Sequence, residues 1–261
     1  MNPRVSLLLA AVVIAGGMVM LWLRDDAAVA PVGSQQAAPV SAVDAYDGEY
    51  VLTISWHPAF CETKPNLAEC RNERTSDYAA DHFSLHGLWP QDDEYCGVGE
   101  DLIAIDEANR WDRLPPIEVS DATWRALQRV MPGTEDNLER HEWVLHGSCA
   151  GTDAETYFRR SIALLDEING SAVRDLLARN LGRHVSRNQV RAAFDAAFGV
   201  GAGRKVRLDC EDDGDRRLVS ELRINVEGAA MNATSLASLI HAARNASAGC
   251  NGGVVDRVGD Q

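Results

Sequence analysis

The sequence predicts an α+β fold in which several α-helices pack on a mainly antiparallel sheet. Segments with alternating apolar residues, typical of strands, lie near both ends of the chain, and helical patterns lie between them. This segregation favours helices packed on an antiparallel sheet over a repeating strand–helix fold. The six cysteines all follow an apolar N-terminal run, and their even number predicts three disulfides in an exported chain.

Residues 1–30 are predicted to be a signal peptide or a signal anchor. Arg4 precedes an apolar run from Val5 to Leu23, and Ala28-Val29-Ala30 is a suitable cleavage site. The run is long for a signal-peptide core and just long enough to span a bilayer, so cleavage and retention both remain open. Either alternative places the rest of the chain outside the cytoplasm, in the periplasm or secreted.

Composition divides the remainder of the chain into three parts. Residues 31–47 are rich in Ala, Pro, Val, Ser and Gln, which is typical of a linker. Residues 48–250 are long enough for one domain with a full hydrophobic core. Residues 251–261 are predicted to be a disordered tail.

The first part of the domain is predicted to hold two strands. Residues 49–57 alternate between apolar and polar side chains and form the first strand. Residues 61–81 are polar and loop-like. A second strand follows, and its alternation directs His86 away from the Phe/Leu side, where Gly87 and Pro90 end the strand.

The middle of the chain is predicted to be helical after an acidic, irregular stretch over residues 91–119. Helices begin at Ser, Asn or Asp because these side chains cap the first turn. The predicted helices begin at Ser120, Asn137, Asp153, Ser171 and Ser186. A hairpin of two strands, 205–210 and 218–226, follows them.

Four of the seven histidines fall in two short segments, 82–90 and 137–149. On a helical wheel, His141, Glu142 and His146 lie within one arc, together with Leu138 and Leu145. Two segments that each supply imidazole can place an acid and a base on opposite sides of one reacting atom.

These segments resemble the two active-site motifs of the ribonuclease T2 family. The first is His86-Gly87-Leu88-Trp89-Pro90, and the second runs from His141-Glu142-Trp143 to His146-Gly147-Ser148-Cys149. Residues 52–61 resemble the first core strand of the family and the turn after it. The resemblance spans about residues 48 to 250 and implies a ribonuclease T2-like catalytic domain with an α+β fold.

The resemblance also implies disulfides between Cys96 and Cys149 and between Cys210 and Cys250. Proximity along the chain favours the third pair, Cys61 with Cys70. The alternative, free thiols at a metal site, lacks the expected Cys-x-x-Cys spacing.

The family chemistry is the metal-independent cleavage of single-stranded RNA through a 2′,3′-cyclic phosphate to 3′-phosphate ends. The 2′-hydroxyl is the nucleophile, so the enzyme supplies a base and an acid and needs no metal or other cofactor. By resemblance, His86 is the acid and His146 the base, while Glu142 and His141 hold the phosphate. A carboxylate repels phosphate, so Glu142 is either protonated or orients a histidine, and the sequence leaves this open.

Base-binding residues follow from the same resemblance. Trp89 offers a face on which a base can stack, and Tyr95 is a second candidate. Gln91 stands where some members of the family carry an Asp that helps to hold the base. The expected enzyme is a monomer with low base specificity that touches a membrane only through an N-terminal anchor.

Leu145 is a departure from the family, which often has Lys at this position. The missing cation motivates an alternative function, a catalytically weak member that binds RNA or signals. Another cation, Arg140 or an arginine from elsewhere, could replace it. Losing one stabilising donor costs about 2–4 kcal/mol of transition-state energy.

Other functions are less compatible with the sequence. His-Glu-x-x-x-x-His superficially resembles a zincin, but zincins need two histidines four apart on one helix face. The formal net charge of −14 argues against a nucleic-acid-binding module that relies on phosphate contacts alone. The other histidines, His57, His82, His184 and His241, and two tryptophans, Trp56 and Trp143, are predicted to be structural.

Overall fold

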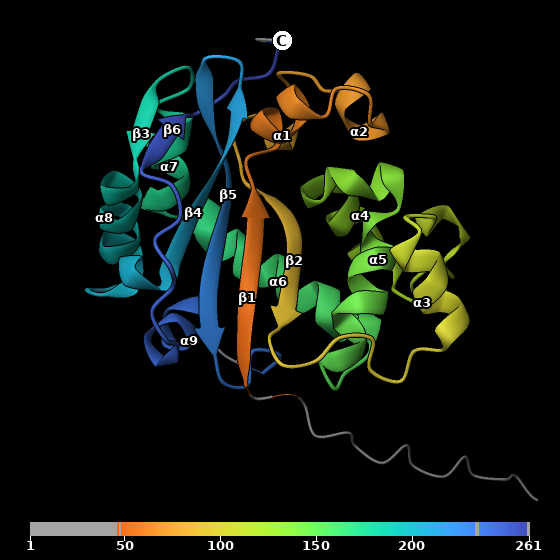
Figure 1. Ribbon diagram of the computed structural model, residues 1–261. Helices are drawn as coiled ribbons and strands as arrows, with labels where there is room; N and C mark the ends of the chain where they lie inside the picture. Colours follow the sequence, from red (N-terminus) through yellow and green to blue (C-terminus); the bar gives the residue numbers. More distant parts are fainter. Residues whose placement is uncertain (1–45, 47, 233–234, 260–261) are drawn as a thin grey trace, which may run out of the picture. The chain divides into compact units, whose positions relative to one another are not determined.

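The computed structural model describes residues 46, 48–232 and 235–259, and Figure 1 shows helices arranged around one sheet. The predicted signal segment, 1–30, and all of the linker 31–47 except residue 46 lie outside the described residues. Across the described part of the chain, no helix combines the length and the apolar character needed to cross a bilayer.

The sheet is mainly antiparallel, as predicted. Its strands lie in the order β2-β1-β5-β6-β3, and β4 pairs with β5 beside this path. The contact between β5 and β6 is parallel, and the other pairs of these strands are antiparallel. The strands are β1 (Glu49–Ser55), β2 (Ser84–Pro90), β3 (His184–Ser186), β4 (Val206–Asp213), β5 (Arg216–Glu227) and β6 (Gly252–Val254).

Most of the longer helices begin where the sequence places a capping side chain. The side chains of Ser120, Asp153 and Ser186 each accept a hydrogen bond from a backbone N–H of the first turn. The helices are α1 (His57–Thr63), α2 (Ala68–Arg71), α3 (Glu100–Glu107), α4 (Asp121–Val130), α5 (Leu138–Leu145), α6 (Ala154–Asn169), α7 (Ala172–Ala178), α8 (Arg187–Phe198) and α9 (Leu236–Ala242).

The core lies on one face of the sheet. Alternate residues of β1, namely Tyr50, Leu52 and Ile54, are fully buried there. They belong to one apolar cluster with residues of α6, which passes behind β1 and β2 in Figure 1. The opposite face carries polar side chains, and Thr53 of β1 pairs there with Arg223 of β5.

β2 contains one extra residue, His86, at the point where its pairing with β1 shifts register. As a result, Leu85 and Leu88 both reach the core although they lie three residues apart. Such a β-bulge re-aims side chains and is common beside active sites. Of the two residues predicted to end this strand, Pro90 does so, whereas the strand continues through Gly87.

β2 is an edge strand, and side chains of α6 satisfy its outer edge. The Tyr157 hydroxyl donates to the carbonyl of Leu88 at 2.9 Å. The Asn169 side chain accepts from the N–H of Phe83 and donates to its carbonyl, both at 2.9 Å. An unpaired buried edge would be costly, so α6 both covers the strand and fixes its position.

All three predicted disulfides are present. They join Cys61 with Cys70, Cys96 with Cys149, and Cys210 with Cys250. The second one ties the loop after β2 to the end of α5, and therefore connects the two segments that carry the sequence motifs.

The prediction of a disordered tail over residues 251–261 is wrong for the part that the structure describes. β6 forms within it, and Val255 and Asp256 are buried. The indole N–H of Trp56 donates to the carbonyl of Asp256 at 2.7 Å. The folded domain therefore extends past residue 250. The prediction missed this because a three-residue Gly-Gly-Val strand shows no alternating pattern.

Three local predictions also need correction. Residues 61–81 contain the end of α1 and all of α2, and residues 91–119 contain α3. Asn137 does not cap α5 with its side chain. It adopts a left-handed conformation with φ 64°, because a 3₁₀ turn over Pro132–Asp136 leads directly into the helix.

Candidate active site

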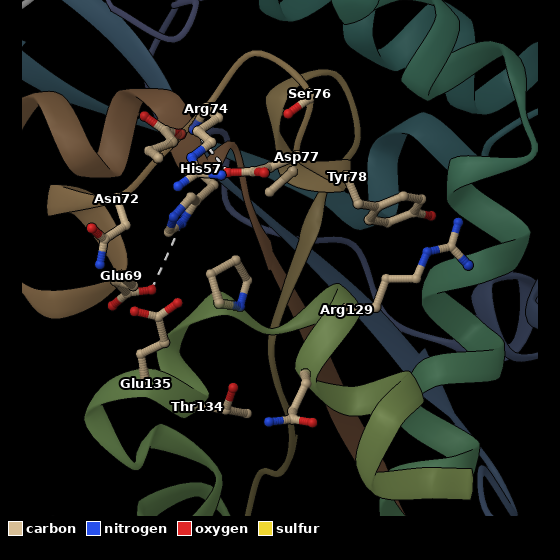
Figure 2. Close-up of a pocket in the computed structure, with 14 residues that line it drawn as sticks. His57, Glu69, Asn72, Arg74, Ser76, Asp77, Tyr78, Arg129, Thr134 and Glu135 are labelled. Atoms are coloured by element: carbon tan, nitrogen blue, oxygen red, sulfur yellow. Dashed lines mark hydrogen bonds and ion pairs between the residues drawn. The ribbon is translucent and has the colours of Figure 1, made fainter.

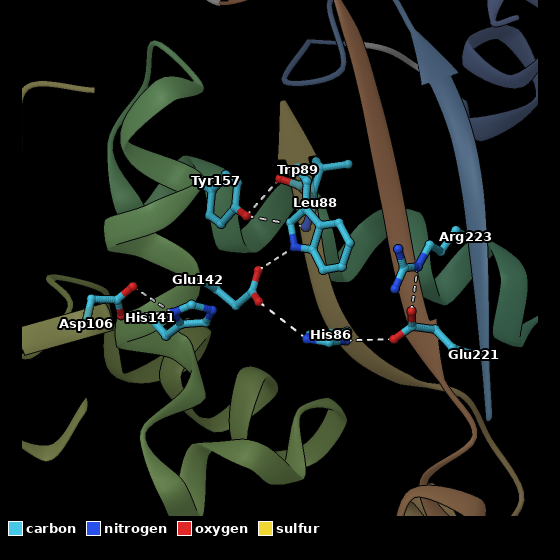
Figure 3. A network of polar contacts seen from close by, with 9 residues as sticks. All are labelled: His86, Leu88, Trp89, Asp106, His141, Glu142, Tyr157, Glu221 and Arg223. Carbon is cyan, nitrogen blue, oxygen red and sulfur yellow. Dashed lines mark hydrogen bonds and ion pairs between the residues drawn. The ribbon is translucent and has the colours of Figure 1, made fainter. Parts of the chain in front are cut away.

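β2 and α5 bring the two sequence motifs together (Figure 3). His86 Nε2 lies 3.7 Å from Glu142 Oε1. The Trp89 ring lies between two histidines, 5.2 Å from the ring of His86 and 5.1 Å from that of His146. The His141 ring is 6.5 Å from the His146 ring. All four predicted catalytic residues therefore belong to one cluster.

Glu142 is held against β2 by Trp89. The indole N–H donates to Glu142 Oε2 at 2.7 Å, while Oε1 is buried and has no hydrogen-bond partner among the described residues. A Cβ added at Gly87 would lie 1.9 Å from Glu142 Oε2, so only glycine lets the carboxyl group approach the strand. This contact explains why the first motif contains glycine.

His86 is fixed on its other side by a residue of β5. Its Nδ1–H donates to Glu221 Oε2 at 2.8 Å, and the same carboxylate accepts from Arg223 Nε at 2.8 Å. The chain Arg223–Glu221–His86 orients the ring so that Nε2 faces Glu142 (Figure 3). A carboxylate on one ring nitrogen fixes both the tautomer and the orientation of a histidine.

His141 has a similar arrangement. Its Nδ1 lies 2.8 Å from a carboxylate oxygen of the buried Asp106, which also accepts from the Tyr95 hydroxyl at 2.8 Å. The ring stacks on Trp111 at 4.5 Å. These contacts hold His141 in place from α3 and from the turn that follows it.

His146 lacks such a partner. Its Nδ1 is buried without a hydrogen-bond partner among the described residues. Burial, followed by the charges of His141 and His86, lowers the pKa of His146 to about 3. The imidazole is therefore neutral at mildly acidic and neutral pH.

The pKa of His86 changes in the opposite direction. Burial alone would lower it, but the hydrogen bond to Glu221 and the charge of Glu142 outweigh burial and raise it. Burial also raises the pKa of Glu142, against the opposing charges of His86 and His141 and the hydrogen bond from Trp89. The site thus holds one histidine that favours its charged form and one that favours its neutral form.

The predicted base-binding residues are distributed differently. Trp89 contacts Glu142 and His146, and Tyr95 is bound to Asp106, so both have contacts within the cluster. Gln91 is exposed beside Trp89. That these three bind a base stays a prediction.

The two cations proposed to replace a lysine at position 145 can now be located. Arg140 donates to the carbonyls of Asp112 and Leu114, so it holds the segment after α3 and is not a substitute. A cation that lies beside the motif tryptophan is Arg223, whose guanidinium carbon is 5.4 Å from the Trp89 ring centroid.

Sequence reasoning missed Asp106, Trp111, Glu221 and Arg223. Asp106 lies in α3, a helix that was not predicted. Glu221 and Arg223 alternate with buried residues along β5, which indicates an outward face. The pairing that brings Glu221 opposite Ser55, close to His86, is long-range and leaves no local pattern.

Clefts adjoin this cluster on two sides. One, of about 430 Å³, is lined by His86 and by residues of the α1, α2 and Trp111 regions. Another, of about 270 Å³, is lined by Trp89, Gln91 and three arginines. The cluster of predicted catalytic residues therefore adjoins two separate clefts.

A larger pocket of about 680 Å³ shares His57, Glu69 and Pro132 with the 430 Å³ cleft and is lined by none of the predicted site residues (Figure 2). His57 itself is buried and lies 3.8 Å from Glu69. Within the described ranges, the one grouping with metal-like spacing is His57, Cys61 and Cys70, and its two sulfur atoms are joined in a disulfide.

Comparison with known proteins places the chain in a family. The family model of the Ribonuclease T2 family matches residues 47–236. Ribonuclease I from Escherichia coli strain K12 is 31% identical over 214 residues, which cover 70% of this chain and 76% of that protein. A probable ribonuclease from Haemophilus influenzae is 24% identical over 192 residues, covering 65% of this chain and 63% of the relative.

Solved structures show the same fold. Ribonuclease MC1 from the seeds of bitter gourd superposes with a TM-score of 0.50 at 17% identity, covering 79% of this chain and 99% of that one. The self-incompatibility SF11-RNase of Nicotiana alata gives a TM-score of 0.50 at 19% identity, with 81% and 100% coverage. The chain therefore belongs to the Ribonuclease T2 family, a family of endoribonucleases.

Proposed function

We propose that the chain is an extracytoplasmic endoribonuclease that cleaves single-stranded RNA by transphosphorylation, without a metal. The observation that carries this proposal is geometric: the rings of His86 and His146 lie 5.2 Å and 5.1 Å from the ring of Trp89, and the indole N–H of Trp89 holds Glu142 beside them. His86 has a raised pKa and favours the protonated form of an acid, whereas His146 has a pKa of about 3 and favours the neutral form of a base.

The first step would begin at the 2′-hydroxyl. His146 takes its proton, the 2′-oxygen attacks phosphorus, and the bond from phosphorus to the 5′-oxygen breaks. His86 gives its Nε2 proton to that leaving oxygen, so a 2′,3′-cyclic phosphate and a 5′-hydroxyl result. In the second step His86, now unprotonated, takes a proton from water, and the water oxygen attacks phosphorus. The bond from phosphorus to the 2′-oxygen breaks, His146 returns its proton to that oxygen, and a 3′-phosphate forms.

Glu142 would work as a neutral group in this mechanism. Its Oε1 is buried, accepts no hydrogen bond from the described residues and lies 3.7 Å from His86 Nε2, and burial raises the pKa of the carboxyl group. A protonated carboxyl can donate to a phosphoryl oxygen that a carboxylate would repel, while the hydrogen bond to Glu221 still favours the charged form of His86. His141, oriented by Asp106, would supply a second donor from the same helix.

Three disulfides support the proposed location. Such bonds persist in the periplasm or outside the cell and are rare in a reducing cytosol. A signal peptide or anchor over residues 1–30 would direct the chain there. The enzyme would act as a monomer, with Trp89, Gln91 and Tyr95 at the base-binding region and low base specificity.

The test is cleavage of RNA by the oxidised, folded protein in EDTA, from about pH 4 to about pH 8. We expect cyclic-phosphate and 3′-phosphate ends, a loss of at least about 100-fold in kcat for His146→Ala, and partial activity for Glu142→Gln. A requirement for added metal ions, or 5′-phosphate ends, would contradict the mechanism. Folded protein without cleavage would favour the alternative that Leu145 motivates, an RNA-binding member with weak activity.

A further inference from the structure

One cleft beside the catalytic cluster is cationic, although the chain carries a formal net charge of −14. Its lining includes Arg207, Arg223 and Arg244 and no carboxylate residue. Trp89 also lines it, so the cleft begins at the catalytic cluster. The other lining side chains are mostly neutral hydrogen-bonding groups, namely Gln91, Asn225, Asn245 and Ser247.

The arginines stand close together at a cost to the fold. Arg207 of β4 and Arg223 of β5 pair directly across the two strands, where like charges are destabilising. Asp209 relieves this repulsion, since one of its oxygens lies 2.6 Å from Arg207 Nε and the other 3.1 Å from Arg223 Nε. An arrangement that needs such compensation indicates a use for the paired cations.

Each arginine is anchored through part of its guanidinium group. Arg223 uses Nε alone, and Arg244 uses one terminal nitrogen, 2.8 Å from Glu49. Arg207 uses Nε and the nitrogen that donates to Ser247 at 3.0 Å. Within the described ranges, the other guanidinium nitrogens make no hydrogen bond or ion pair, and side chains 43–65% exposed leave them accessible to solvent.

We infer that this cleft binds backbone phosphate of the RNA strand on the 5′ side of the cleaved bond. The inference rests on the proposed function for its direction. The proposed general base, His146, acts on the 2′-hydroxyl of the nucleotide on the 5′ side of the cleaved bond. Trp89 stacks on His146 and therefore lies beside that nucleotide. The preceding phosphate would then lie beyond Trp89, at Arg207 and Arg244. Arginine forks suit phosphate oxygens in such a position.

The test uses oligodeoxynucleotides that contain a single ribonucleotide, so that each has one cleavable bond. A short substrate is compared with one extended by deoxynucleotides on the 5′ side and with one extended on the 3′ side. For the unmodified protein we expect the 5′ extension to lower KM, with kcat unchanged, and raised salt to diminish this gain.

The variant pair Arg207→Gln and Arg244→Gln should remove the gain from the 5′ extension. For both substitutions together we expect KM for the 5′-extended substrate to rise roughly tenfold, because one exposed ion pair contributes about two- to fivefold in affinity. KM for the short substrate should stay the same. Arg179→Gln is the matched control, because Arg179 follows the last residue of α7, pairs with one carboxylate and lines none of this cleft. Thermal unfolding would verify that each variant is folded.

The possible failures are distinguishable. Absence of cleavage of every substrate by the unmodified protein would count against the proposed function itself. Cleavage with no 5′ gain, or a 5′ gain that the arginine variants retain, would overturn the inference about the cleft. A gain that depends on the arginines but follows the 3′ extension would overturn its direction.

Discussion

The site contains three histidines, and the carboxylates beside them differ. Glu221 binds Nδ1 of His86 and Asp106 binds Nδ1 of His141, whereas Nδ1 of His146 has no partner among the described residues. A buried imidazole next to a carboxylate favours its charged form, and one without a carboxylate favours its neutral form. The proposed roles of His86 as acid and His146 as base therefore follow from the carboxylate beside Nδ1 of His86 and from the lack of a partner at Nδ1 of His146 among the described residues.

Replacing Glu221 tests this argument. Glu221→Gln removes the negative charge while keeping a side chain of similar size, so the pKa of His86 should fall. The alkaline limb of the kcat/KM profile, where the acid loses its proton, should then move to lower pH, and activity at about pH 7 should fall roughly 10-fold or more. The measurement is a pH–rate profile on a short RNA substrate.

Glu227→Gln is the control for this variant, because it removes one negative charge from the same strand at a distance from His86. It should leave the alkaline limb in place. If Glu221→Gln lowers kcat/KM equally at every pH, the carboxylate only positions the ring, and its proposed effect on the charge of His86 is wrong.

At the scale of elements, the position of β2 depends on α6. β2 carries His86 and Trp89, but it lies at the edge of the sheet and has β1 on one side only. Asn169 and Tyr157 occupy the other side and satisfy backbone groups of β2 and of the residue before it. α6 thereby fixes the strand that bears the proposed acid, His86.

We expect Asn169→Ala to destabilise the protein and to lower its activity. The change leaves the buried N–H and carbonyl of Phe83 without partners, at a cost of about 2–4 kcal/mol. Urea unfolding gives the free energy, and kcat on folded protein gives the effect on His86. Ser161→Ala, also buried on α6, is the control, because Ser161 bonds only within its own helix. Equal losses in both variants would contradict this account.

The same scale shows what the sequence could and could not predict. The two motifs, the central helices and the β4–β5 hairpin follow local patterns. Two of the disulfides were implied by the resemblance to the family, and the third by proximity along the chain. α3 was missed because it interrupts an acidic stretch without a clear apolar face, and β6 because it has three residues. Asp106 contacts His141, and Glu221 contacts His86, although the members of each pair lie far apart in the sequence. Local sequence patterns therefore could not place them at the site.

At the scale of the whole molecule, the chain is acidic, and one of its carboxyl groups, that of Glu69, is buried beside the cleft that His86 lines. Glu69 lines both the larger pocket and the cleft beside His86, and its side chain is 8% exposed. Burial, followed by the charges of Asp136 and Glu135, raises its pKa to about 7 (Figure 2). Such a buried carboxyl links the stability of the domain to pH in the range where RNA cleavage is expected.

The sign of this effect follows from proton binding. The pKa of Glu69 is 4.5 in the unfolded state and about 7 in the folded state. At a pH between these two values, the folded state keeps a proton on Glu69 that the unfolded state has lost. This contribution to stability is therefore complete below 4.5 and lost as the pH rises through about 7, with an upper limit of about 3 kcal/mol. His57, with a pKa lowered to about 4 by burial, acts oppositely, because acid favours its unfolded, protonated form.

We therefore expect Glu69→Gln to change how the free energy of unfolding depends on pH. On going from about pH 5 to about pH 8, the change in this free energy should favour the folded state more in the variant than in the unmodified protein. The glutamine cannot lose a proton, so it avoids the cost of a buried charge at the higher pH. Urea unfolding at both pH values measures the difference, and Glu118→Gln, at an exposed position, should leave it unchanged. A shift of the same size in both variants would assign the effect to net charge. No shift in either would mean that Glu69 titrates alike in the folded and unfolded states, and that its burial beside His57 does not govern the acid stability of the domain.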